Sequence, residues 1–113
     1  MVPEMSETVT IKDFKKLDIR IGNVVKVEQV PGSRSLFKMQ VDMGDEVRQI
    51  VASLVGYYTA EELKGKVIAV IVNLKPARIF GQTSNGMLLA AEKDDKLALI
   101  TVDREIPNGA KLT

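Results

Sequence analysis

The sequence predicts an all-β fold, a five-stranded Greek-key barrel of the OB type with one short helix capping an end. Short stretches that alternate apolar and polar residues recur at close spacing, and turn residues separate them. A helix-start signal falls mid-chain, between the third and the fourth of these stretches. An immunoglobulin-like sandwich, the main alternative, would need about seven strands and no helix in the middle. With 113 residues, the chain is long enough for one domain.

The first ten residues are expected to form a flexible tail, followed by one domain over residues 11–113. The tail carries acidic residues and no apolar run, so we do not expect a signal peptide. Thr10 and Asp13 have the spacing of a capping box, in which two side chains bond free backbone N–H groups at a helix start. This spacing predicts a short helix with Phe14 and Leu17 on one face.

The first strand is predicted from a long alternating run over residues 17–28. Ile21 and, further along, Val25 are expected to face the core. Residues 22–23, a glycine and an asparagine, interrupt the run. Glycine inside a strand is typical of a bulge or a sharp bend, so we expect one there.

The next two strands are separated by clear turn signals. A Pro-Gly-Ser turn at residues 31–33 precedes a strictly alternating strand that carries Phe37, Met39, Val41 and Met43. A second turn, at residues 44–46, leads into a third strand over residues 47–52.

A second capping box, formed by Thr59 and Glu62, predicts a helix of about two turns that ends at Gly65. The β-branched run that follows, residues 67–72, is apolar throughout. Such a run predicts a strand that is covered on both faces. Further strands are expected at residues 78–80, 87–91 and 97–102.

Many kinds of chemistry are excluded by composition, because the chain has no cysteine and no histidine. Disulfides, thiol nucleophiles, histidine-based triads and the usual zinc ligands are therefore absent. The adjacent acidic pairs lie beside turns or a helix start, where solvated carboxylates are expected. No apolar run is long enough to span a membrane. We therefore expect a cytoplasmic binding protein with no enzymatic activity, cofactor, metal or small-molecule substrate.

The basic residues are spread unevenly, although the net charge is only +1. Residues 63–91 carry four basic side chains and no acidic one, whereas residues 1–62 sum to −2. A shorter acid-free stretch over residues 29–41 holds Arg34 and Lys38. The small net charge argues against a histone-like binder of nucleic acid. The uneven distribution fits a local phosphate-binding surface and, equally well, the acid-poor sequence of a buried strand.

Aromatic residues are too few for general binding of single strands. Such binding on OB barrels stacks successive bases on exposed rings. Phe14 and Phe37 fall on apolar faces, which leaves Tyr57, Tyr58 and Phe80. A folded nucleic acid, bound through its phosphates and shape, needs fewer rings and is the better match.

The strongest local signal lies at residues 73–79 and 84–90. Lys75 and Arg78 flank the bend at Pro76, so their charges can reach neighbouring phosphates with little loss of entropy. A solvated loop is the alternative interpretation of these two cations. Asn85 and Gly86, taken alone, favour a tight hairpin turn, because both tolerate positive φ.

These stretches resemble the tRNA-binding domain family, which comprises dimeric OB-fold tRNA-binding proteins, the C-terminal domain or β subunit of methionyl-tRNA synthetases, and CsaA-type export chaperones. The matching stretches are FKKLDIRIG at 14–22, KMQVDMG at 38–44, QIV at 49–51, YTAEELKGK at 58–66, NLKPAR at 73–78 and SNGMLLAA at 84–91. They follow the family order across residues 11–91. The chain departs from the pattern at Arg34, where an acidic-Lys-Leu sequence is usual, at Ala52, at Phe80, which stands before Gly81 in place of a basic residue, and at Asn85.

The resemblance implies a homodimer that binds tRNA by shape, at its outer corner, and catalyses no reaction. It implies that Asn73, Lys75, Arg78, Ser84, Asn85 and Met87 line the tRNA-binding surface, with Lys38 and Arg34 nearby. It also implies that residues 97–112 form a C-terminal dimerisation extension. The implied partners are tRNA, a second copy of the chain and a methionyl-tRNA synthetase, for which the protein would act as a stand-alone tRNA-binding protein or β subunit.

A CsaA-type export chaperone that binds unfolded polypeptide is the alternative function. It would require an exposed apolar groove. The Asn-Leu-Lys-Pro and Ser-x-Gly-Met sequences, which the chaperone branch tends to lose, are both retained here and favour tRNA binding.

Overall fold

The computed structural model describes residues 7–113. Residues 1–6, the first part of the predicted tail, lie outside the described residues, and residues 7–10 are exposed and belong to no helix or strand. The elements are α1 (Ile11–Phe14), β1 (Ile19–Gln29), β2 (Leu36–Asp42), β3 (Val47–Ser53), α2 (Ala60–Leu63), β4 (Val67–Ile71), β5 (Ala77–Ile79), β6 (Gln82–Ser84), β7 (Met87–Leu88), β8 (Ala90–Lys93) and β9 (Lys96–Leu99).

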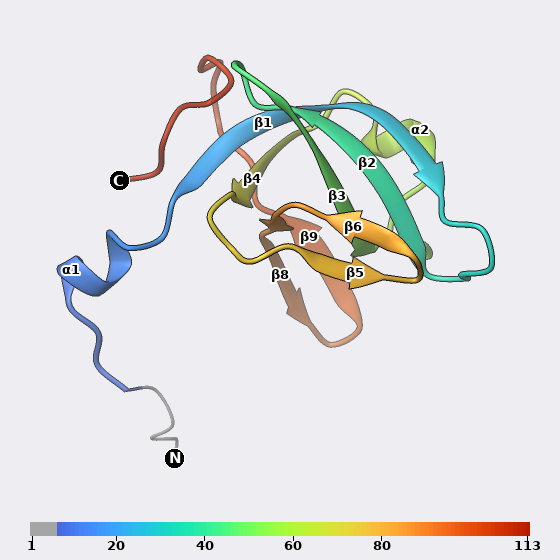
Figure 1. Ribbon diagram of the computed structural model, residues 1–113, viewed down its shortest axis with the longest axis horizontal. Coiled ribbons are helices and arrows are strands. Elements are labelled where there is room, and N and C mark those ends of the chain that lie inside the picture. Colours follow the sequence, from blue (N-terminus) through green and yellow to red (C-terminus); the bar gives the residue numbers. More distant parts are fainter. Residues whose placement is uncertain (1–6) are drawn as a thin grey trace.

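Five strands form the barrel, in the order β3-β2-β1-β4-β7, and every neighbouring pair is antiparallel. The chain runs β1-β2-β3 as a meander and then crosses through α2 to place β4 on the free side of β1 (Figure 1). This crossing makes the connection a Greek key. The predicted five-stranded OB-type barrel is confirmed.

The barrel is nearly closed by bonds from β3 to β6, to the residues between β6 and β7, and to the end of β4. The Asn85 backbone N–H donates to the Gln49 carbonyl at 2.7 Å, and the Gln49 side-chain amide donates to the Thr83 carbonyl at 2.8 Å. The Arg48 guanidinium donates from one nitrogen to the carbonyls of Val72 and Asn85, each at 2.9 Å. Side chains therefore supply much of the closure that a regular strand ladder would otherwise provide.

β4 is buried on both faces, as its sequence predicts. Ile68 and Val70 point into the main core, while Ala69 and Ile71 pack on the outer face of the barrel. All four are at most 7% exposed. The outer cluster is covered by partly buried residues from both ends of the described chain and from the segment between: Phe14, Val67, Leu89, Val102 and Leu112.

Both predicted capping boxes are present, but both helices are shorter than expected. α1 ends at Phe14, so Leu17 lies beyond it and is 37% exposed. α2 has four residues because Lys64 is already extended and Gly65 takes φ +92°. Its one buried residue, Leu63, belongs to the main core cluster.

The irregularity in β1 lies further along than the sequence indicates. The register with β2 shifts between Val24 and Lys26, so Val24 is 1% exposed and Val25 is 44% exposed. The expectation that Val25 faces the core was therefore wrong. Gly22 serves a different purpose, since a Cβ there would lie 2.5 Å from the Met43 sulfur, and only glycine allows the two strands to approach this closely.

The last third of the chain forms two small hairpins outside the barrel, β5–β6 and β8–β9. β6 was not predicted, and the strand expected at residues 87–91 is divided into β7 and β8. The chain then returns to β1, where Gly109 and Leu112 donate backbone bonds to Ile21 and Ile19 at 2.7 and 2.9 Å. These bonds pair the first residues of β1 along the edge that β2 does not reach.

Candidate nucleic-acid interface

The β5–β6 hairpin carries the basic segment that the sequence singles out. It lies outside the barrel, and its turn points toward the loop between β1 and β2 (Figure 1). The turn consists of Phe80 and Gly81, with φ values of +53° and +78°. The tight turn expected at Asn85 and Gly86 was wrong, because Asn85 is not among the residues with positive φ and β6 and β7 are not paired.

Gly86 is required by a close approach of chain segments. A Cβ on Gly86 would lie 2.9 Å from the Ile71 carbonyl oxygen and 3.0 Å from the side chains of Ile50 and Val70. Glycine therefore lets the chain pass over β4 on its way into β7.

Asn73 fixes the start of the loop that leads into the hairpin. Its side-chain oxygen accepts a bond from the Asp18 backbone N–H at 2.9 Å, and its side-chain amide nitrogen donates to the Lys16 backbone carbonyl at 2.7 Å. The Asp18 carboxylate in turn accepts bonds from Arg20 at 2.8 and 3.2 Å. These bonds, together with the positive charge of Arg20, hold the pKa of Asp18 below its usual range. Asn73 thus ties the loop to the beginning of β1.

Lys75 and Arg78 are both exposed, but their charges are held differently. Within residues 7–113, no carboxylate oxygen lies within 4.0 Å of the Lys75 ammonium. Arg78 folds across its own hairpin, donating to the Gly81 carbonyl at 3.0 Å and to the Thr83 hydroxyl at 3.4 Å. The hairpin therefore presents one loosely held cation and one that is fixed in place.

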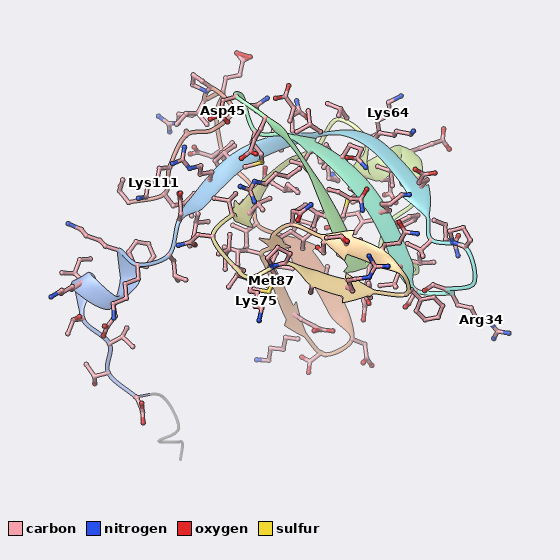
Figure 2. All side chains as sticks on the ribbon, in the orientation of Figure 1. Arg34, Asp45, Lys64, Lys75, Met87 and Lys111 are labelled. Atoms are coloured by element: carbon pink, nitrogen blue, oxygen red, sulfur yellow. The ribbon has the colours of Figure 1, made fainter. Side chains whose placement is uncertain are left out.

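Ser84 and Met87 differ sharply in exposure. Ser84 is 4% exposed, and its hydroxyl accepts a bond from the Val51 backbone N–H at 3.0 Å and donates to the Gly86 carbonyl at 3.0 Å. Met87 is 48% exposed. Figure 2 shows Met87 and Lys75 at the same end of the hairpin. Ser84 is thus placed to hold the segment, whereas Met87 can touch a ligand.

Arg34 and Lys38 lie toward the other end of the hairpin. Figure 2 places Arg34 beyond the turn of β5–β6, well away from Lys75. The Lys38 ammonium lies 3.4 Å from the side-chain oxygen of Gln82 and 3.6 Å from the Glu28 carboxylate. Lys38 therefore connects β2 to β6, and part of its charge is already compensated.

The four cations of residues 63–91 do not converge on one surface. Lys64 follows α2 on the side of the barrel opposite Lys75 (Figure 2). The Lys66 ammonium lies 5.7 Å from the centre of the Tyr58 ring. Only Lys75 and Arg78 belong to the loop and hairpin. We use the name hairpin face for the surface around the β5–β6 hairpin that is formed by Arg34, Lys38, Lys75, Arg78, Phe80 and Met87.

Residues 7–113 contain no group of three or more acidic side chains placed to hold a metal ion. They also contain no helix that is long and apolar enough to cross a membrane.

A nearly closed OB barrel with cations on an appended hairpin is typical of a binding module. The family model described as "Putative tRNA binding domain" matches residues 19–111. The chain belongs to the tRNA-binding domain family, and this region is a binding domain and not a catalytic one.

Relatives of known sequence are methionine–tRNA ligases. The chain is 50% identical over 109 residues to that of Archaeoglobus fulgidus and 52% identical over 105 residues to that of Thermotoga maritima. These matches cover 96% and 93% of this chain but only 17% of each ligase. The chain thus corresponds to a small part of each enzyme.

Two solved structures cover nearly the whole chain. A MetRS related protein from Pyrococcus horikoshii superposes with a TM-score of 0.90 at 38% identity, covering 96% of this chain and 100% of that one. The chaperone CsaA from Bacillus anthracis str. Ames superposes with a TM-score of 0.85 at 29% identity, covering 95% of this chain and 100% of that one. The fold is therefore shared by a synthetase-related protein and a chaperone.

Proposed function

We propose that the chain binds folded tRNA by its shape and phosphates, through the hairpin face. The observation that carries this proposal is that two cations, Lys75 and Arg78, lie on a loop and a hairpin that are both fixed to the barrel. Because the loop is anchored by Asn73 and the hairpin by Arg78 itself, little entropy is lost when phosphates are bound. In this proposal Asn73, Ser84 and Asn85 position the segment, and Arg34, Lys38, Lys75, Arg78 and Met87 contact the RNA.

The protein is further proposed to act as a homodimer. An apolar cleft of about 230 Å³ lies between α1 and the C-terminus, lined in part by Ile11, Phe14, Leu17 and Leu112. Ile11 is 70% exposed, and Ile106, in the segment for which the family resemblance implies dimerisation, is 47% exposed. A second copy that covers these residues would bury them and double the number of hairpin faces.

A methionyl-tRNA synthetase is the proposed enzyme partner. The support is that the regions matched in the two relatives reported above belong to methionine–tRNA ligases. Binding tRNA next to such an enzyme raises the effective concentration of its substrate. The cytoplasm, where tRNA is charged, is the proposed location.

Binding of unfolded polypeptide is the second candidate function. It is favoured by the similarity to CsaA and by three exposed apolar side chains in or next to the hairpin: Leu74, Phe80 and Met87 are 40%, 61% and 48% exposed. The cations beside these residues favour RNA.

A titration with three ligands at two salt concentrations tests the choice. We expect salt-sensitive binding of bulk tRNA and weaker binding of a poly-pyrimidine strand and of an unfolded polypeptide. Binding of the polypeptide without tRNA would overturn the proposal and establish the second candidate.

A further inference from the structure

Phe80 has an unusual backbone conformation for an aromatic residue. It takes φ +53° at the first turn position of the β5–β6 hairpin. Asparagine, aspartate and glycine are the residues that suit this position, whereas a bulky side chain there is strained. Strained backbone conformations cluster at functional sites, where the side chain is needed for function although its conformation lowers stability.

The ring is exposed and lies beside the loop between β1 and β2. Phe80 is 61% exposed, and a Cβ added to Gly32 would lie 3.6 Å from an edge carbon of the ring. The preceding residue, Ile79, packs against the buried cluster of Val30, Leu36 and Val51. The loop beside the ring is itself braced, because the Ser33 hydroxyl accepts bonds from the backbone N–H groups of residues 35 and 36.

Phe80 is also the one ring that the fold leaves available on the hairpin face. Phe37 is buried, and Phe14 covers the outer apolar cluster. Tyr58 accepts a bond from the Leu99 backbone N–H and lies beneath Lys66. Tyr57 is within 3.5 Å of the Glu92 carboxylate, an acidic neighbour that disfavours RNA.

We propose that Phe80 is a stacking platform for an unpaired base of the bound RNA. This inference rests on the proposed tRNA binding and adds that the hairpin face recognises an unpaired base of the RNA. Arg34 lies on the loop that borders the ring, and Arg78 lies two residues before Phe80, so both cations can contact phosphates of an RNA bound at the ring. Bases in loops and bulges of folded RNA are commonly recognised on an aromatic face.

The charge around the ring favours RNA over an apolar segment of protein. Phe80 follows Arg78 by two residues and borders the loop that carries Arg34. A ring that served only apolar docking would not need these two cations nearby. Polypeptide binding is nevertheless included as an outcome of the test below.

The absence of tryptophan from the chain makes a direct optical test possible. Phe80→Trp introduces a single indole, whose fluorescence is quenched when a base stacks on it. We expect quenching by bulk tRNA and by an RNA duplex with a one-base bulge, and none by the same duplex without the bulge. Val47→Trp is the matched control, since Val47 is 59% exposed on β3 near Asp45, away from the hairpin turn (Figure 2).

Two further variants test separately the aromatic face of Phe80, as distinct from its apolar volume, and the backbone strain at this position. Phe80→Leu keeps the bulk but has no aromatic face, and it should weaken binding to the bulged duplex about 5-fold or more, with an unchanged salt dependence. Phe80→Asn relieves the strained turn, so its Tm should rise while its binding to the bulged duplex falls. A rise in Tm together with a fall in binding would show that the ring serves binding and does not stabilise the fold.

The outcomes distinguish failure of this inference from failure of the proposed function. If tRNA binds with salt dependence, but Phe80→Trp responds equally to both duplexes or Phe80→Leu binds like the wild type, the stacking role is wrong and tRNA binding stands. If neither tRNA nor the duplexes bind, both proposals are overturned. If an unfolded polypeptide alone changes the indole fluorescence, the ring belongs to a protein-binding surface and both proposals are overturned as well.

Discussion

Asn73, Lys75 and Arg78 lie within six residues of one another, yet their side chains are held in three different ways. Asn73 makes both of its side-chain bonds to the chain that enters β1, and Arg78 bonds to its own hairpin. Lys75 has neither kind of contact among the described residues. Removing its charge should therefore change the electrostatics of the hairpin face and leave the fold intact.

Lys75→Ala should weaken tRNA binding for all tRNA species alike and reduce the slope of log K against log salt by about one, the value for one lost phosphate contact. Affinity measured at several salt concentrations tests this. Lys64→Ala is the matched control, because Lys64 is also exposed and belongs to the same acid-free stretch but lies on the opposite side. Equal slopes for the two variants would place the binding surface elsewhere.

Asp18 should make the stability depend on pH at the acid end. The bonds from Arg20 lower the pKa of Asp18 in the folded chain, so on acidification the unfolded chain binds this proton first. The stabilisation is therefore complete above about pH 4 and is lost as the pH falls further. Asp18→Asn should lower Tm at pH 7 by an amount equivalent to at most about 1 kcal/mol, and the difference should shrink toward pH 2.

Thermal unfolding at pH 7, 4 and 2 measures this difference. Asp103→Asn is the control, because the Asp103 side chain is 80% exposed and bonds only to its neighbour Arg104. A difference between wild type and Asp18→Asn that stays constant with pH would contradict the assignment.

Elements with local signals could be predicted from sequence, and elements defined by pairing could not. Both capping boxes and the alternating β2 depend on residues a few positions apart, and all three were predicted. The bulge at Val25 depends on how β1 pairs with β2, which alternation along one strand does not reveal. β6 has three residues and follows a turn that begins with phenylalanine, so neither its pattern nor its turn is typical of a hairpin.

Closure of the barrel between β3 and β7 should depend on Arg48. Its guanidinium is the group that bonds the carbonyls at the end of β4 and before β7, and its side chain is 25% exposed. Arg48→Ala leaves two carbonyls without this partner and should lower the free energy of unfolding by about 1–3 kcal/mol. Because these carbonyls border the loop to Lys75, tRNA affinity should fall as well.

Chemical denaturation of Arg48→Ala beside Arg104→Ala provides the measurement. Arg104 is 82% exposed and pairs only with Asp103, so its removal should change the free energy by less than about 0.5 kcal/mol. Equal stability of the two variants would mean that the backbone contacts and the side-chain bonds of Gln49 and Ser84 close the barrel without Arg48.

At the scale of the whole molecule, the sequence identified the basic segment but not which of its cations share a surface. Lys64 and Lys75 are 11 positions apart and lie on opposite sides of the barrel, because β4 runs between them. Ser84 gives the converse case. It lies in the matched segment, yet it is buried because β3 supplies the N–H group that it bonds. Both facts depend on how distant strands pack.

Dimerisation through the cleft between α1 and the C-terminus can be tested by a substitution that leaves the fold of the single chain intact. Ile11 is 70% exposed and begins α1, where an acidic residue is tolerated, so Ile11→Glu should fold normally. A second copy would bury this carboxylate in a cleft that is mostly apolar, and the lost hydration makes burial unfavourable even though Lys15 and Lys111 also line the cleft. Wild type should therefore sediment at twice 12.4 kDa and Ile11→Glu at 12.4 kDa.

The same variant should bind tRNA with a smaller salt dependence, because a single copy offers half as many cations to the RNA. Val47→Glu, which adds the same charge at a residue that is 59% exposed on β3, should remain dimeric and bind as the wild type does. A wild type that is monomeric at high concentration would refute the dimer. An Ile11→Glu variant that stays dimeric would move the interface away from the cleft, toward the exposed residues of the segment around Ile106.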